Sequence, residues 1–532
     1  MQPAEIATAK GVSPATGRWV LFATILASSM AFIDGSALNV ALPALQRDLG
    51  ASGVELLWIV NGYALFLAAL LLVGGALGDR FGRKRVFMIG IAIFAVASLV
   101  CGFAPTTLVL IVSRMIQGIG GALMVPGSLA LISASFGGHE RGRAIGTWSS
   151  FSTITTIIGP TLGGVLAAQG LWRAVFFINI PLALVALAVL QFKVPESRNA
   201  EAPAQLDYPG AVLTALGLGG LTFGLLRAPE VGWTAFETLV PIIGGVLALI
   251  AFVLVEARST HPMVPLTLFR NRTFSGTNLM TLFLYGALYG MLFFLPLNLI
   301  QIQGYSEVAA GFAGLPSGLL LAVLSRWSGT LIDRIGPRIP LTVGPAIAGI
   351  GFAMFALPGL TSGPQSYWWT YFPALIVQGI GMAITVAPLT TAVMGSVSSH
   401  QSGVASGVNN AVSRAAGVLA IAAFGAIALA SFSGALGSRG AALRLPQEVQ
   451  QALQAQASNL GNAQPPPSLP QDAQAQAVQA IKLAFVDMFR LLALIGAGLA
   501  WLSALLAWLT VDNRLVSPDD AEAKKSSKPQ PV

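Results

Sequence analysis

A single aspartate, Asp34, stands inside the apolar stretch of residues 30–43, MAFIDGSALNVALP. If the helix begins near Trp19 at a membrane face, a rise of about 1.5 Å per residue places Asp34 roughly 22 Å deep. An ionised carboxylate at that depth costs about 3 kcal/mol or more, so its charge state depends strongly on what surrounds it. Such a group can take up and release a proton as its surroundings change. The alternative is a structural carboxylate that bonds Ser36, Asn39 or a neighbouring helix.

Arg114 lies inside another apolar stretch, and Gln117 follows one helical turn later on the same face. A buried guanidinium needs acceptors, such as a carboxylate, backbone carbonyls or water. Arg114 is therefore predicted to bind polar groups of neighbouring helices. A purely structural tie between helices satisfies the same requirement.

A glycine–proline cluster interrupts a later apolar stretch and consists of Gly159, Pro160, Gly163 and Gly164. Proline leaves a backbone carbonyl of its helix without a donor and bends the helix. Gly159 and Gly163 are spaced to form a face on which another helix can pack closely. The alternative is a proline kink without further consequence.

A short charged segment between two apolar stretches, residues 75–86, predicts a tight turn at a membrane face. A weaker copy returns at residues 329–338. We expect Asp79 to pair with Arg83 or with the N-terminus of a neighbouring helix, and Arg141 and Arg143 are candidate partners across the gap. Such a conformational latch would comprise Asp79, Arg80, Gly82 and Arg83, with Asp333 and Arg334 in the copy. The alternative is a solvated charge cluster that only sets topology.

Several polar or amphipathic side chains lie within apolar stretches and could face a central cavity, although a helix–helix hydrogen bond is the simpler role for each alone. They are Asn39, Asn61, Tyr63, Gln117, Tyr285, Tyr289, Asn298, Gln378, Asn409, Asn410 and Arg414. Arg326 adds a further positive charge to the second half, and apart from Asp34 no carboxylate is clearly mid-span. As ligands of such a cavity, these charges favour lipophilic neutral, anionic or monocationic compounds over multivalent cations.

The composition indicates that this chain is a membrane protein. Of its 532 residues 55% are apolar and 9% charged, whereas a soluble domain carries about 25% charged residues. A span needs about 20 mainly apolar residues. This criterion predicts an all-α polytopic membrane protein with fourteen transmembrane helices, at residues 19–38, 54–77, 86–103, 106–133, 144–168, 172–192, 208–226, 239–257, 274–301, 309–332, 340–358, 367–393, 403–431 and 484–511.

Two copies of one turn, about half a chain apart, suggest two related six-helix bundles with two helices inserted between them. The predicted division is an N-terminal segment 1–18, a first bundle 19–192, a linker with the inserted helices 193–272, a second bundle 273–511 and a tail 512–532. The second bundle contains one long extramembrane segment, 433–482. Its parts 446–458 and 471–482 could form polar helices, so we expect a surface hairpin there. We expect the charged tail to be disordered.

An even number of spans puts both termini on one side. Most Lys and Arg residues fall on the side of the termini, and the positive-inside rule therefore assigns that side to the cytoplasm. This distribution accounts for the net charge of +8 without nucleic acid. One cysteine and three histidines make no convincing zinc site, and no P-loop motif for ATP occurs. Nor does a nucleophile–base constellation, so we expect no enzyme and no cofactor.

The motifs taken together resemble the major facilitator superfamily. The turn at 75–86 is similar to the loop between its second and third spans, and the Arg114 region to its fourth-span motif. Residues 34–43 resemble the first span of fourteen-span drug:proton antiporters of the EmrB/QacA type, with Ser36 in place of the usual threonine. Residues 155–164 resemble the antiporter motif, although Thr155 replaces its leading glycine. Residues 172–181 also resemble this branch and are interpreted as an interface anchor.

The resemblance implies the major facilitator fold, with Arg114 responding to the protonation state of the first span. It also implies efflux of lipophilic compounds from a bacterial cytoplasmic (inner) membrane, driven by the proton gradient. In a double-membrane bacterium it adds a periplasmic adaptor protein as a candidate partner of residues 433–482, for which a gate or a flexible tether are alternatives. A solute importer or symporter of the same fold and a non-transporting membrane receptor are the competing functions.

Overall fold

The computed structural model describes residues 13–136, 138–198, 207–259, 262, 264–329, 331–398, 401–467 and 469–513. The expectations for the N-terminal segment before Ser13 and for the tail after Asn513 lie outside the described residues. Thirteen helical segments among them are long and apolar enough to cross a membrane, and a shorter apolar helix stands at the remaining predicted span, 340–358. The predicted all-helical, fourteen-span organisation is therefore confirmed.

The first bundle contains the predicted six spans, the last of which is broken after its first turn. Its helices are α1 (Pro14–Leu49), α2 (Gly53–Phe81), α3 (Arg83–Gly102), α4 (Thr107–Ser135), α5 (Gly138–Ala168), α6 (Ala174–Phe177) and α7 (Asn179–Lys193). Local sequence sets these boundaries. The hydroxyl of Ser13 accepts a hydrogen bond from the Thr16 amide to begin α1, which ends at Gly50 in the left-handed region. Ser52 and Glu55 form a capping box that begins α2.

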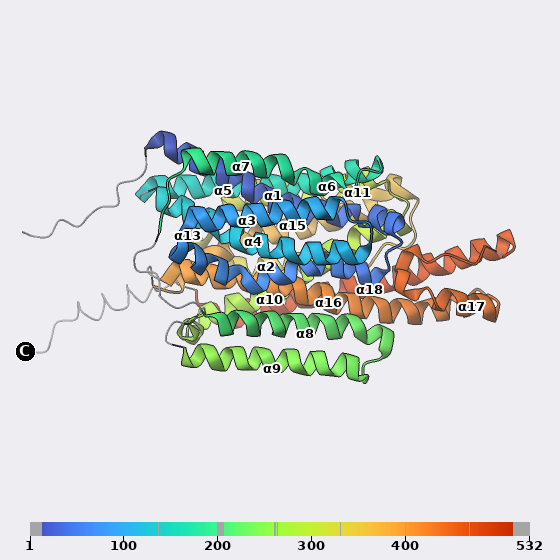
Figure 1. The fold of residues 1–532 in the computed structure, drawn as a ribbon. Coiled ribbons are helices and arrows are strands. Elements are labelled where there is room, and N and C mark those ends of the chain that lie inside the picture. The colour runs from blue at the N-terminus through green and yellow to red at the C-terminus, as the bar shows by residue number, and fades with distance from the viewer. Residues whose placement is uncertain are drawn as a thin grey trace, which may run out of the picture.

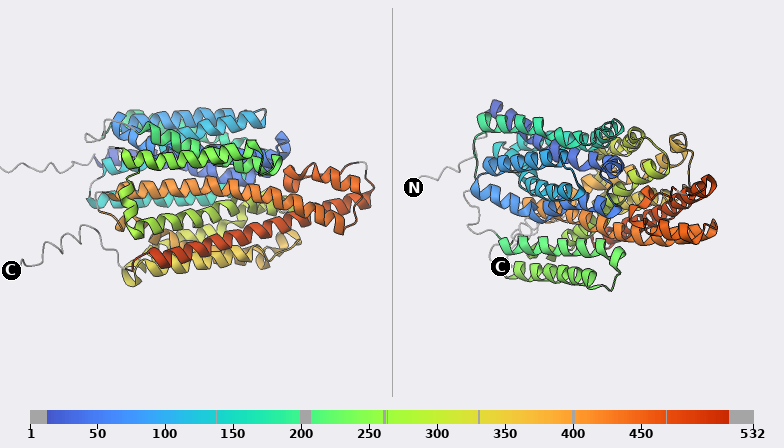
Figure 2. Two further views of the ribbon diagram at one scale, coloured as in Figure 1. Left: turned by 90° about the horizontal axis from the view of Figure 1, so that it is seen from below. Right: turned by 45° about the vertical axis from the view of Figure 1, so that its right-hand side comes forward.

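The two inserted helices are α8 (Tyr208–Val231) and α9 (Phe236–Arg258). Helix α8 packs on α2 of the first bundle and on α16 of the second, so the hairpin lies across the seam between the bundles (Figure 2). Helix α9 packs on α8 and exposes apolar side chains along its length, at Phe236, Leu239, Val240, Ile243, Val246, Leu247, Ile250, Val253 and Leu254. This is the surface expected of a helix in contact with lipid.

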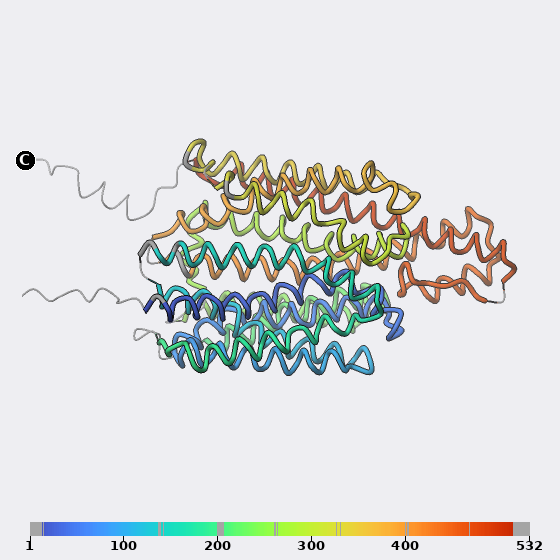
Figure 3. The backbone as a smooth tube through the Cα atoms, turned by 90° about the horizontal axis from the view of Figure 1, so that it is seen from above, coloured from blue at the N-terminus to red at the C-terminus, as the bar shows by residue number. Residues whose placement is uncertain are grey.

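The second bundle holds the remaining six spans. Its helical segments are η1 (Leu266–Arg270), α10 (Arg272–Leu297) with the π-helical turn η2 (Asn298–Ile302), α11 (Glu307–Ala313), α12 (Leu315–Gly329), α13 (Leu331–Ile335), α14 (Arg338–Met354), η3 (Gly363–Trp369), α15 (Tyr371–Gly395), α16 (Ser402–Ala442), α17 (Gln447–Gln454), η5 (Ala457–Asn462) and α18 (Gln471–Thr510). Figure 3 shows the blue-to-teal first bundle on one side and the yellow-to-red second bundle on the other.

All spans run roughly parallel, so the molecule has two ends. We call the end where α1 begins and α18 finishes the terminal end, and the opposite end the extension end (Figure 1). Residues 433–482, the extension, project there because α16 continues to Ala442 and α18 begins at Gln471, beyond the predicted spans. Arg439 joins the two helices through a two-point ion pair with Asp487, at 2.7 and 2.9 Å. The predicted polar helices exist, although they also bury small apolar faces, Val449 and Leu453 among them.

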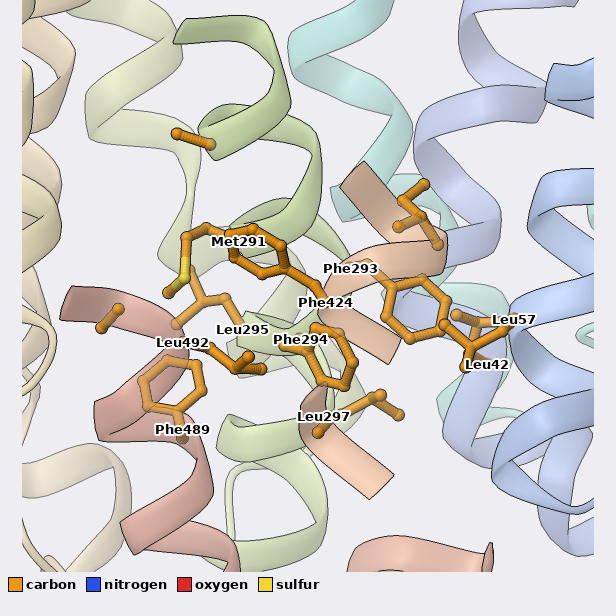
Figure 4. Packing of buried hydrophobic residues seen from close by; sticks show 14 of the residues in the cluster. Leu42, Leu57, Met291, Phe293, Phe294, Leu295, Leu297, Phe424, Phe489 and Leu492 are labelled. Carbon is orange, nitrogen blue, oxygen red and sulfur yellow. The ribbon is translucent and has the colours of Figure 1, made fainter. Parts of the chain in front are cut away.

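The apolar core is divided unequally between the two ends. One continuous cluster fills the second bundle and includes the extension-end parts of α1 and α2. Figure 4 shows part of it, where Phe293 and Phe294 of α10 lie in the same packed group as Leu42 of α1 and Leu57 of α2. A separate cluster fills the terminal-end part of the first bundle, from Val20 to Val194. The bundles thus share a core at the extension end.

Candidate functional site

Asp34 lies in the middle of α1 and has no exposed surface. Its Oδ2 forms an ion pair with Nη1 of Arg114. Its Oδ1 accepts hydrogen bonds from Nε2 of Gln117 at 2.9 Å and from Nδ2 of Asn179 at 3.4 Å. Of the structural alternatives, a bond to Ser36 does not occur, because the Ser36 hydroxyl donates to the Phe32 carbonyl of its own helix at 2.7 Å, whereas bonds to neighbouring helices do. The carboxylate is thus held by α4 and α7.

Arg114 is equally buried and finds the acceptors that its position requires. Nε donates to the Ile59 carbonyl of α2 at 3.2 Å, and Nη1 also donates to Oε1 of Gln117 at 2.7 Å. The guanidinium lies over the ring of Tyr63, 4.4 Å from its centroid. Arg114 and Gln117 therefore join α1, α2 and α4 in one polar cluster inside the first bundle.

Asn179 belongs to this cluster and was not among the residues predicted from the sequence. It begins α7 directly after the break that follows α6. Its Nδ2 also donates to the Ser98 hydroxyl at 2.9 Å, and Ser98 in turn donates to the Phe176 carbonyl of α6 at 2.9 Å. A lone asparagine in the apolar run 174–181 was the available signal. The interface anchor predicted for residues 172–181 stays a prediction; at the start of this segment Trp172 donates to Asp48 at 3.1 Å.

A proton on Asp34 would change the charge balance of this cluster. With Asp34 ionised, the charges of Asp34 and Arg114 neutralise each other in a site that excludes water. Protonating Asp34 leaves a buried guanidinium without its counter-ion, and breaking a buried pair in this way costs about 3–5 kcal/mol. The arrangement that suits the ionised form therefore differs from the one that suits the neutral form.

The glycine–proline cluster of α5 sits where α1 and the second bundle meet. A Cβ on Gly159 would collide with the hydroxyl of Ser36, and one on Gly163 with the backbone of Ala37. This is the close helix contact that the spacing predicts. On another side, a Cβ on Gly311 of α11 would lie 2.6 Å from the Pro160 carbonyl. Helix α5 therefore touches both α1 and the second bundle through backbone at this point.

The turn between α2 and α3 is fastened to the end of α7. Asp79 and Arg83 pair at 2.8 Å as predicted, whereas Arg141 and Arg143 are exposed. Gly82 has a φ of 113°, which favours glycine, and a Cβ there would lie 2.7 Å from the carboxyl of Glu196. Glu196, absent from the sequence prediction, accepts from the Lys84 amide at 2.9 Å and the Arg85 amide at 3.1 Å. It thereby caps the positive end of α3.

The second copy of this turn also has a glycine with positive φ, 73° at Gly336. Arg334 is exposed at the end of α13. The side chain of Asp333 lies outside the described residues, and so does that of Arg326. Arg80, the remaining member of the predicted latch, lies with its guanidinium 5.0 Å from the ring centroid of Phe81.

The polar residues proposed for a cavity divide into two groups. Some form the helix–helix hydrogen bonds that were the simpler expectation. Gln378 accepts from Ser317 at 2.7 Å, Asn409 donates to Thr281 at 2.8 Å, and Asn298 donates to Tyr371 at 2.8 Å. Others keep polar atoms without a hydrogen-bond partner or lie partly open, namely Asn39, Asn61, Tyr63, Tyr285, Tyr289, Asn410 and Arg414.

At the extension end, polar side chains join the two bundles directly. Arg47 of α1 forms an ion pair with Glu307 of α11. Gln301 donates to Gln46 at 2.8 Å, and Gln46 donates to the carbonyl of Asn459 in η5 at 3.4 Å. The extension therefore contacts the seam, and this end of the molecule is closed.

Comparison with known proteins gives a family match over most of the chain. Residues 24–421 match the family model described as Major Facilitator Superfamily. The chain is 33% identical over 422 residues to the multidrug resistance protein Stp of Mycobacterium tuberculosis, covering 78% of this chain and 76% of that protein.

Other relatives include proteins named for export. The chain is 32% identical to the tetracenomycin C resistance and export protein of Streptomyces glaucescens, with 94% of this chain and 92% of that protein covered. It is 34% identical to the cephamycin export protein CmcT of Amycolatopsis lactamdurans, with 77% and 84% covered.

Among solved structures, a bacterial homolog of the human lysosomal transporter Spinster, inward-facing and unoccupied, has a TM-score of 0.63 at 18% identity and covers 94% of this chain and 99% of that one. The D-xylose–proton symporter has a TM-score of 0.57 at 14% identity, with 93% and 98% covered. At these identities the likeness concerns the fold alone.

Proposed function

Because this chain belongs to the major facilitator superfamily, we propose that it exports lipophilic compounds across a bacterial cytoplasmic membrane in exchange for protons, by alternating access. The relatives named as resistance and export proteins support this function. The proton gradient would be its energy source, with no further cofactor. The family consists of transporters, not enzymes.

The observation that carries the proposal is the buried pair of Asp34 and Arg114. Both side chains are sealed inside the first bundle, and Ser36 and Ala37, close after Asp34 on α1, pack against α5. A change in the protonation of Asp34 alters what Arg114 and Gln117 bind, and these residues touch α1, α2 and α4. Since α2 packs on α16, and α1 packs on α5, which in turn packs on α11, the change can reach both contacts with the second bundle.

The orientation follows from the charges. Both termini and the α2–α3 turn are placed in the cytoplasm, which puts the extension outside. The described conformation, with its shared core and ion pair at the extension end, is then closed to the outside. Labelling of Arg198→Cys and Ala455→Cys with an impermeant reagent tests this. Only the residue 455 variant should react in intact cells.

The test of function is transport by the purified protein in proteoliposomes under an imposed proton gradient. Rhodamine 6G, fluorescein and a neutral dye serve as substrates, and the direction of dye movement relative to the gradient distinguishes an exchanger from a symporter. Asp34→Asn keeps the shape and removes the titratable group, so gradient-driven movement should be lost. Asp48→Asn, an equal change at the exposed end of the same helix, is the control. Gradient-driven transport that survives in Asp34→Asn would remove Asp34 from the coupling role.

A further inference from the structure

We propose that Arg414 anchors a binding site for aromatic anions, in which the guanidinium holds a carboxylate or phenolate and tyrosine rings hold its apolar body. The inference rests on the proposed function and specifies the substrate class. Arg414 lies on α16, the helix of the second bundle that packs against α2 of the first and against α10. A ligand bound there would contact both bundles.

The neighbours of Arg414 come from both sides of the seam. Ala64 of α2 and Ala415 of α16 pack in the same small apolar cluster, which places Tyr63 and Arg414 at the same level. The ring of Tyr289 packs where a Cβ on Gly417, one turn after Arg414, would lie.

Arg414 differs from Arg114, Arg439 and Arg490 in what it binds. Arg114 has Asp34, Arg439 has Asp487, and Arg490 has the Leu357 carbonyl. Within the part of the chain that the structure describes, Arg414 makes no hydrogen bond or ion pair, although its side chain is half-buried. The carboxylate of Asp34 is already taken by Arg114 and Gln117. A guanidinium at membrane depth without a counter-ion attracts an anion strongly, because the low dielectric screens its charge poorly.

The groups around the guanidinium suit an aromatic oxyanion. The rings of Tyr285 and Tyr289 stand 6.2 Å apart and are partly open, which gives an aromatic body two faces to pack on. Asn410, one turn before Arg414 on the same helix, is exposed and adds a further polar group. A cationic ligand would meet the uncompensated charge of Arg414 instead.

The experiment compares two dyes that share a xanthene body and differ in charge, fluorescein and rhodamine 6G. Binding to the detergent-purified full chain is followed by fluorescence anisotropy, without a proton gradient. Arg414→Gln should raise the Kd of fluorescein by about tenfold or more, since a hydrogen bond to a charged group is lost. The Kd of rhodamine 6G should stay the same or fall. Arg414→Lys should restore part of the fluorescein affinity.

Arg490→Gln removes an equal charge from the same bundle and should bind both dyes as the wild type does. Retained rhodamine 6G binding shows that Arg414→Gln is folded. A wild-type protein that does not bind fluorescein, an Arg414→Gln variant that binds it equally well, or an equal loss for both dyes would overturn the proposal. Arg414-dependent binding without gradient-driven transport would instead refute the proposed function and leave the site standing.

Discussion

Asp34 carries a charge that α1 alone could not hold at this depth. Three side chains from other helices make the ionised form tolerable, and each of them is itself positioned by a further bond. Asn179, for example, is oriented by the Ser98 hydroxyl at 2.9 Å. The proposed coupling group is therefore a network rather than a pair, and residues that do not titrate should affect transport.

Replacing Asn179 by alanine tests this. The change removes the bond to Ser98 and the longer one to Asp34, which should cost about 1 kcal/mol of stability and slow gradient-driven efflux several-fold. Thermal unfolding and initial efflux rates measure the two effects. Ser98→Ala removes the orientation of Asn179 and the bond to the Phe176 carbonyl but leaves the bond of Asn179 to Asp34 possible, so it should have the smaller effect on efflux. Wild-type efflux in Asn179→Ala would confine the network to Asp34, Arg114 and Gln117.

Among the helices, α5 is the one whose close packing depends most on glycines. Gly159 and Gly163 bring its backbone against α1, and the next residues meet α11 of the second bundle. A helix that slides or tilts at this seam needs small, smooth contacts, and the neighbouring Pro160 allows it to bend.

Gly163→Ala should therefore destabilise the protein by about 1–3 kcal/mol, because the added methyl group meets the backbone of Ala37, which cannot rotate away. Gly146→Ala is the matched control on the same helix, since its Cβ would have nothing within 4 Å. The melting temperatures of the two purified variants give the comparison. Equal melting temperatures would show that α5 does not depend on this contact.

The α2–α3 turn is the second element whose function can be isolated. Asp79→Asn and Arg83→Ala break the 2.8 Å pair and should lower the maximal transport rate more than they raise the Kd for substrate, because the turn lies at the terminal end and away from the Arg114 cluster. Arg85→Ala removes an exposed charge from the same turn and should leave the rate nearly unchanged. If all three variants transport at the wild-type rate, the turn only sets topology.

On the scale of the whole molecule, the closed extension end is the feature that alternating access must reverse. Cysteines at Arg47 and Glu307, in a Cys101→Ser background, can be joined by a short bifunctional thiol reagent. The link should stop transport because it holds the two bundles together. Linking Asp48→Cys to Arg173→Cys, an ion pair at the same end but within one bundle, should leave transport intact. Transport by the linked Arg47–Glu307 variant would mean that this end does not open there.

The extension supplies the last prediction. It reaches past the spans (Figure 1) and its η5 segment touches Gln46 of the first bundle, so a gate and a docking site for an adaptor both remain candidates. Replacing residues 447–467 with a short Gly/Ser linker should lower resistance in whole cells while the protein stays inserted. Proteoliposomes without an adaptor then separate the two, because a gate loses activity there and a docking site does not. Full resistance in cells would leave only a connecting role.

The sequence alone determined the number and position of the spans, because burying some 20 apolar residues in lipid outweighs any other local preference. It also identified Asp34, Arg114 and the glycine faces, since a charge or a bare backbone at that depth needs an explanation wherever its partners lie. The sequence did not show which side chains from different helices contact one another. Asn179 and Glu196 are ordinary polar residues in the chain, and only the packing of α7 against α1 and of residue 196 against Gly82 gives them a role.

The same holds for the difference between Arg114 and Arg414. In the sequence both are arginines inside apolar helices, and neither neighbourhood reveals a counter-ion. The bundle brings α1 and α4 together, so that Arg114 is neutralised by a residue 80 positions away, while α16 faces the seam, where the described chain provides no carboxylate for Arg414. Whether a buried charge is satisfied or open to a ligand depends on distances between helices, and these are set by packing across the whole molecule, not by spacing along the chain.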